Sequence, residues 1–97
     1  MLEREIERWL GERLKKLGCL YFKFVSPMNP GVPDRIVITP GGRTIYVELK
    51  TEIGRLSNIQ KWQIDRMRKC GADVRRVKGI EEARAFAQEI EREVMPT

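Results

Sequence analysis

The chain has 97 residues and a net charge of +5, from 19 Lys and Arg against 14 Asp and Glu. It therefore predicts a single domain, residues 1–97, with a surface suited to a polyanionic partner. Because the sequence contains no His, catalysis by Ser–His or Cys–His pairs and metal sites with His ligands are excluded. It also lacks an apolar run of the roughly 18 residues that a membrane span needs, and a signal-peptide core, so neither a membrane partner nor export is expected.

An amphipathic pattern over residues 2–17 predicts the first helix, with Gly18 as its C-terminal stop. Among its acids, Glu3 lies closest to the apolar stripe, about 50° from its centre on a helical wheel. Glu3 is therefore the acid best placed to face a sheet, although a glutamate at the edge of such a stripe also reaches solvent readily. The stripe consists of Leu2, Ile6, Trp9, Leu10, Leu14 and Leu17.

Residues 20–25 predict the first strand, and residues 26–33 a stiff, exposed loop that holds three prolines and a glycine. Ser26, Asn29 and the backbone N–H groups of this loop are suited to holding a phosphate. A rigid connector is the alternative interpretation of the same residues.

Residues 35–39 and 44–50 predict two further strands, joined by a turn over residues 40–43. If the connection is three residues long, Asp34 lies opposite Glu48, with Cβ atoms about 4.5–5.5 Å apart. An even-length loop would instead place Asp34 on the opposite face, so the pairing requires an odd loop or a bulge. Lys50 lies two residues beyond Glu48 and therefore on the same face.

Two carboxylates that oppose each other across a sheet repel each other. Burying their charges at the end of an apolar strand also costs free energy of folding. A divalent cation between them reverses the sign of that interaction, and Mg²⁺ commonly binds through one or two carboxylates with waters and a phosphate. Asp34 and Glu48 therefore predict a site for Mg²⁺ or Mn²⁺, with the positive charge of Lys50 beside it. A solvated strand edge that carries Glu and Lys is the alternative.

Residues 51–56 form a short segment that contributes Arg55, and residues 57–69 predict the second helix. The spacing of Ser57 and Gln60 matches a capping box, in which the Gln60 side chain bonds the backbone of Ser57. The helix has a basic surface that includes Lys61. Its predicted apolar face consists of Ile59, Trp62, Met67 and Cys70.

Residues 72–77 predict the last strand, and a final helix begins at Gly79 and ends at Pro96. Cys19 and Cys70 lack metal-ligand spacing, so buried reduced thiols are expected rather than a disulfide. The predicted order of elements is αβββαβα, which belongs to the α/β class.

Pro33-Asp34, followed after residues 35–47 by Glu48-Leu49-Lys50, resembles the PD-(D/E)xK nuclease motif. The longer string, which begins at Gly31-Val32 and extends to Leu56-Ser57 and Gln60, is similar to the VRR-NUC (virus-type replication-repair nuclease) family. The resemblance covers most of the chain, from about Glu3 to the strand over residues 74–77. It implies a restriction-endonuclease-like core, in which a mixed β-sheet is flanked by helices.

The resemblance also implies an endonuclease that hydrolyses DNA with the help of Mg²⁺ or Mn²⁺ and no organic cofactor. Asp34, Glu48 and the backbone carbonyl of Leu49 would hold the ion, and Glu3 would complete its shell or recruit a second ion. The catalytic set would be Glu3, Asp34, Glu48, Lys50 and Gln60.

Lys50 would face the attacking water or the phosphate, either as a base or as an electrostatic stabiliser. Gln60 would lie beside this lysine and order water or phosphate, a role that conflicts with its use as a helix cap; we favour the role in the site. The expected contacts to nucleic acid are Ser26, Asn29, Arg35, Arg55 and Lys61.

One site cuts one strand, so action on both strands of a branched junction requires two copies related by a two-fold axis. Stand-alone members of the resembled family are small dimers, often phage-encoded, that act on four-way (Holliday) junctions. We therefore expect a homodimer that acts on branched DNA in the cytoplasm of a bacterial or phage-infected cell, in DNA repair or related processes. The alternatives are cleavage of flap, duplex or single-stranded DNA, and a non-catalytic DNA-binding module.

Overall fold

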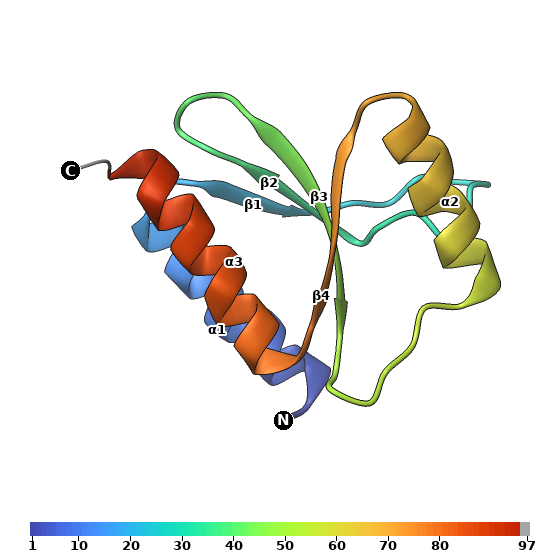
Figure 1. Cartoon of the computed structure of the whole chain (residues 1–97), viewed down its shortest axis with the longest axis horizontal. Helices are drawn as coiled ribbons and strands as arrows, with labels where there is room; N and C mark the ends of the chain where they lie inside the picture. Colours follow the sequence, from blue (N-terminus) through green and yellow to red (C-terminus); the bar gives the residue numbers. More distant parts are fainter. Residues whose placement is uncertain (96–97) are drawn as a thin grey trace.

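A computed structural model describes residues 1–95 of the chain (Figure 1). The predicted order αβββαβα is confirmed, and the predicted helix end at Pro96 lies outside the described residues. No helix within residues 1–95 has the length and apolar character of a membrane span. The elements are α1 (Glu3–Lys16), β1 (Leu20–Lys23), β2 (Arg35–Ile38), β3 (Thr44–Lys50), α2 (Asn58–Lys69), β4 (Asp73–Lys78) and α3 (Gly79–Val94).

The four strands form one mixed sheet in the order β1-β2-β3-β4. β1–β2 and β2–β3 are antiparallel, whereas β3–β4 is parallel and is connected through α2. Figure 1 shows α1 and α3 side by side on one side of the sheet, and α2 on the opposite side beside β4. The mixed sheet flanked by helices agrees with the expected fold class.

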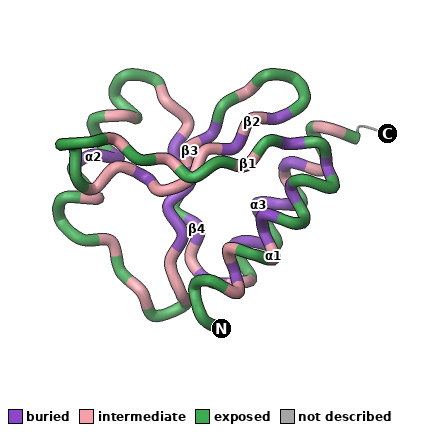
Figure 2. Tube along the Cα trace, turned by 180° about the vertical axis from the view of Figure 1, so that it is seen from behind, coloured by how far each residue is buried: buried purple, intermediate pink, exposed green. Residues whose placement is uncertain are grey.

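The core lies between the sheet and the α1–α3 pair, where Figure 2 shows buried stretches along β3, β4 and both helices. Side chains from one face of the central strands meet the apolar stripes of the two helices, and each fully buried Leu, Ile or Val contributes about 1.5–3 kcal/mol. The fully buried residues include Ile6, Leu10, Leu14, Val37, Ile45, Val47 and Ile90.

The predicted apolar face of α2 is wrong. Trp62 is 52% exposed, Cys70 is exposed, and the helix instead buries Gln63 and Ile64. Ile59, which was also expected on that face, is 42% exposed. The polar side chain of Gln63 can be buried because its Nε2 donates a hydrogen bond to the carbonyl oxygen of Pro30 at 3.0 Å.

The β2–β3 hairpin has the odd loop that the sequence requires. Its three connecting residues, 40–42, are closed by a bond from the Thr39 N–H to the Arg43 carbonyl (2.9 Å), and Gly42 has φ +90°, which favours glycine. Arg35 pairs with Val47, so one further step in the same register sets Asp34 opposite Glu48. The predicted register is confirmed.

Candidate active site

The loop before β2 fixes the position of Asp34. Pro33 is fully buried, and the Asp34 carbonyl accepts a hydrogen bond from the Phe24 N–H at 2.8 Å. Gly31 has φ +88°, and a Cβ there would lie 2.8 Å from the carbonyl oxygen of Ile59. Only glycine lets the loop pass this close to the start of α2. The Gly31-to-Asp34 stretch therefore packs against the start of α2 and places Asp34 directly before the start of β2.

Burial raises the pKa values of both acids, and the charge of Asp34 raises that of Glu48 further. Glu48 is 4% exposed, and its pKa is raised to about 7, first by burial and then by the charge of Asp34, whereas the charge of Lys50 opposes the shift. Burial is also the main cause of the raised pKa of Asp34. Asp34 Oδ1 is buried without a hydrogen-bond partner among residues 1–95. An unpartnered carboxylate oxygen beside a second buried carboxylate is suited to a divalent cation.

Two side chains with hydrogen-bond donors meet the Glu48 carboxylate. The Lys50 Nζ lies 3.7 Å from Glu48 Oε2, and the Gln60 Nε2 donates to the same oxygen at 3.4 Å. The Oε1 of Gln60 accepts from the Ser57 N–H at 2.9 Å, and the Gln60 N–H donates to Ser57 Oγ at 3.2 Å. Opposite ends of one amide therefore make the helix cap and the contact with Glu48, so the cap does not prevent Gln60 from facing Glu48, and its role in catalysis stays a prediction.

The chain is similar to known proteins both in sequence and in fold. Residues 3–81 match the sequence profile of the VRR-NUC domain. The chain belongs to the VRR-NUC family. A solved structure described as a VRR_NUC domain superposes with a TM-score of 0.83 at 30% identity, over 89% of this chain and 94% of that one. A second, a VRR_NUC domain protein, has a TM-score of 0.73 at 17% identity, over 93% of this chain and 88% of that one, and supports the fold alone.

The chain is also similar to one curated phage protein. Protein p44 of Acyrthosiphon pisum secondary endosymbiont phage 1, provisionally named a nuclease, is 48% identical over 48 residues. The match covers 50% of this chain and 52% of p44, so the chain spans about half the length of the curated relative that it matches. These comparisons identify a nuclease domain.

Glu3 does not form a metal-binding cluster with Asp34 and Glu48 within the described residues of this VRR-NUC domain. It is exposed in the first turn of α1, and within residues 1–95 no group of three acidic or thiol side chains is close enough to hold an ion. The helical wheel misled here because α1 begins to pack on the sheet only at Ile6, so Leu2 and Glu3 both extend beyond the core. The charge of Glu3 is nonetheless among the causes that raise the pKa of Glu48.

Arg35, which was predicted to contact DNA, is bonded within the VRR-NUC domain instead. Its side chain is 17% exposed, its Nε donates to Glu7 Oε1 at 3.2 Å, and its Nη1 donates to the Asp34 carbonyl at 2.9 Å. These bonds connect α1 to the start of β2. Arg35 therefore supports the backbone of Asp34 instead of lying open to a phosphate.

The other expected DNA contacts are more accessible. Arg55, Lys61 and Asn29 are exposed, and Ser26 is half-buried. The Asn29 Nδ2 donates to Ser26 Oγ at 2.9 Å and to the Pro27 carbonyl at 3.2 Å, which closes the loop on itself. The loop is thus a structured turn, and its contact with phosphate stays a prediction.

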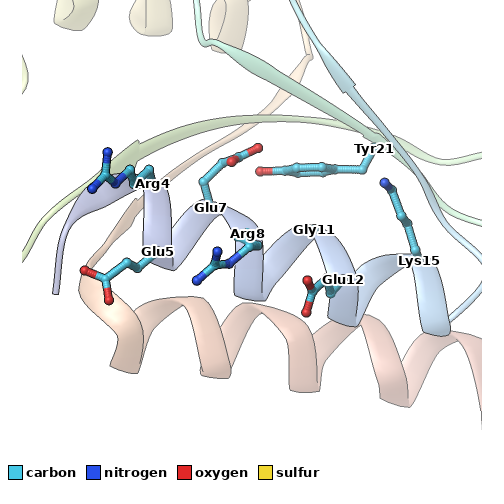
Figure 3. A pocket seen from close by; sticks show the side chains of 8 residues that line it. All are labelled: Arg4, Glu5, Glu7, Arg8, Gly11, Glu12, Lys15 and Tyr21. Atoms are coloured by element: carbon cyan, nitrogen blue, oxygen red, sulfur yellow. The ribbon is translucent and has the colours of Figure 1, made fainter.

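A groove of about 460 Å³ on the outer side of α1 lacks the features of a nuclease site (Figure 3). The Glu7 carboxylate points toward the Tyr21 hydroxyl, and Gly11 leaves room for the Tyr21 ring, since a Cβ there would lie 3.1 Å from it. Burial, reinforced by the charge of Glu7, raises the pKa of Tyr21, so its hydroxyl stays protonated. Neither Asp34 nor Glu48 lines this groove.

Stability of the metal-free protein should fall as pH rises through 7. The pKa of Glu48 is raised from 4.5 to about 7, so between these values the folded state binds a proton that the unfolded state has lost. The resulting loss is of the order of 3 kcal/mol in the free energy of unfolding. Urea unfolding at pH 5 and pH 8 with EDTA measures it, and Glu48→Gln should remove most of the difference. Equal wild-type stability at both pH values would contradict the burial of this charge.

Proposed function

We propose that this VRR-NUC domain is a Mg²⁺- or Mn²⁺-dependent DNA endonuclease whose substrate is branched DNA such as a four-way junction. The observation that carries the proposal is the Asp34–Glu48 pair, in which Asp34 Oδ1 is buried without a hydrogen-bond partner among residues 1–95 and the Lys50 ammonium lies beside Glu48. The relation to p44, which is named as a nuclease, supports it further. The proposed place of action is the cytoplasm of a bacterial or phage-infected cell.

The groups around the Asp34–Glu48 pair would have different roles in phosphodiester hydrolysis. Asp34, Glu48 and the Leu49 carbonyl would hold the ion, which when bound activates water and neutralises charge on the phosphate. The Lys50 ammonium is the cation nearest to Glu48 and would stabilise the negative charge that grows on the phosphate oxygens. The Gln60 amide, fixed at its other end by the helix cap, would orient the water or the phosphate.

We further propose that the active form is a homodimer. A domain of this size has one such pair and cuts one strand, whereas two copies related by a two-fold axis address both strands of a junction. Support comes from apolar side chains that the fold leaves uncovered. Leu20 and Phe22 on the edge strand β1 are 52% and 50% exposed, and Trp62 on α2 is 52% exposed. Such side chains suit an interface better than open solvent.

The test is cleavage of labelled four-way, flap, duplex and single-stranded DNA with Mg²⁺, by wild type and by Asp34→Ala. We expect wild type to cut the four-way junction most efficiently, and the variant or added EDTA to remove cleavage of every substrate. Ca²⁺ should permit binding without hydrolysis. Equal cutting of all four substrates would contradict selectivity for junctions, and binding without any cutting by the wild type would favour a non-catalytic DNA-binding module.

A further inference from the structure

A groove of about 400 Å³ lies between α2 and the edge strand β4. Its lining contains three arginines and two apolar residues, with no acid among them: Leu56, Ile64, Arg68, Arg75 and Arg76. A groove with this composition suits a chain of phosphates that also offers apolar sugar surface.

The groove adjoins the candidate active site. In the parallel β3–β4 pair, Glu48 lies beside Arg76, so the two side chains occupy neighbouring positions on one face of the sheet. Along α2, Gln60 contacts Glu48, while Ile64 and Arg68 follow at intervals of four residues on the same side of the helix. The strand register and the helix spacing therefore place this groove next to Glu48, along α2 and β4.

Arg75 is already committed to partners within the protein. Its guanidinium binds Asp73 at 2.6 Å and Glu89 at 2.8 Å, and it lies over the Phe86 ring on the side of the sheet that faces α3. It lines the groove without offering its guanidinium to a ligand there.

Arg68 and Arg76 are the two arginines that can meet a ligand. Arg68 lines the groove, and its Nε and Nη2 donate to the Val74 carbonyl at 3.1 and 2.7 Å, which fixes its guanidinium beside β4. Arg76 contacts only Glu82 among residues 1–95, at 3.3 Å, and both side chains are nearly half exposed. An ion pair of this kind contributes at most about 1 kcal/mol and exchanges readily for a phosphate.

We propose that this groove holds the sugar–phosphate backbone of the DNA strand next to the phosphate that is cut, with Arg76 as a positioning residue and Arg68 as its neighbour. The proposal rests on the proposed endonuclease function and adds a defined path for the strand. The contacts are to phosphates, so the groove carries no sequence preference.

Arg76→Ala tests the path, and Arg84→Ala is the matched control. Arg84 is an exposed arginine on α3 that forms a single pair with Glu81 at 3.2 Å, so the two variants lose the same charge and a similar ion pair. Affinity for a four-way junction is measured with Ca²⁺ between 50 and 200 mM salt. Arg76→Ala should weaken binding about threefold to tenfold and reduce the slope of log affinity against log salt by about 0.9, which corresponds to one phosphate contact. Arg84→Ala should change neither.

Cleavage with Mg²⁺ provides the second readout. Arg76→Ala should raise KM with kcat within about twofold of wild type, and Arg76→Lys should restore most of the salt slope. Wild-type affinity and slope in Arg76→Ala, or an equal loss in Arg84→Ala, would overturn the proposal. Binding is measured without hydrolysis, so the two proposals can fail separately. If the wild type never cuts DNA but Arg76→Ala alone weakens binding, the endonuclease proposal is refuted, whereas the groove remains supported as a DNA-binding site.

Discussion

Asp34→Asn is expected to abolish metal-dependent cleavage and at the same time to stabilise the metal-free protein. The substitution removes one of the two charged ligands of the proposed ion, so cleavage should fall by about 1000-fold, equivalent to about 4 kcal/mol of transition-state stabilisation. The same change removes a half-buried charge that repels Glu48 and whose Oδ1 has no hydrogen-bond partner in the described part of the chain. The free energy of unfolding at pH 8 with EDTA should therefore rise by about 1 kcal/mol.

The opposite signs of these two effects make the experiment specific. A residue that merely supports the fold would lose activity together with stability, whereas a ligand in a strained pair loses activity and gains stability. Asp65→Asn, at an exposed position on α2, is the matched control and should change neither quantity. An Asp34→Asn protein that unfolds more easily than wild type in EDTA would contradict the repulsion between the two acids.

The elements that the sequence predicted well depend on local rules. The β2–β3 register follows from a three-residue loop, and a period of two then decides which side chains share a face. The opposition of Asp34 and Glu48 was predictable for that reason. The buried stripe of α1 from Ile6 onward was predictable in the same way, since its period of 3.6 is set within one helix.

The features that the sequence did not predict depend on contacts between distant segments. An apolar face on α2 does not reveal how much of the sheet the helix covers, so the exposure of Trp62 could not be foreseen. The place of Arg76 beside Glu48 arises from the parallel β3–β4 pairing, which no turn between the two strands specifies. The link from Arg35 to Glu7 likewise joins residues that lie on different elements.

Lys50→Ala should separate catalysis from binding. The Lys50 ammonium lies 3.7 Å from Glu48 Oε2, and in the proposed mechanism it stabilises charge that develops only as the phosphate reacts. Loss of one such donor lowers the cleavage rate by about 100-fold to 1000-fold. Junction binding with Ca²⁺ should weaken by less than about tenfold, because at most one phosphate contact is lost. Lys16→Ala, at an exposed position on α1, is the control of equal charge.

The pH dependence of metal binding gives the same variant a second, independent test. The charge of Lys50 opposes the rise in the pKa of Glu48, so its removal should move that pKa further above 7. A Glu48 with a higher pKa loses its proton only at a higher pH, and it must lose that proton to bind the ion. The pH at which Mn²⁺ half-saturates the site should therefore be higher in the variant than in wild type. Cleavage at the wild-type rate under saturating Mg²⁺ would remove Lys50 from the mechanism. A loss of cleavage with unchanged pH dependence of Mn²⁺ binding would instead mean that Lys50 acts on the phosphate alone, without tuning the carboxylate beside it.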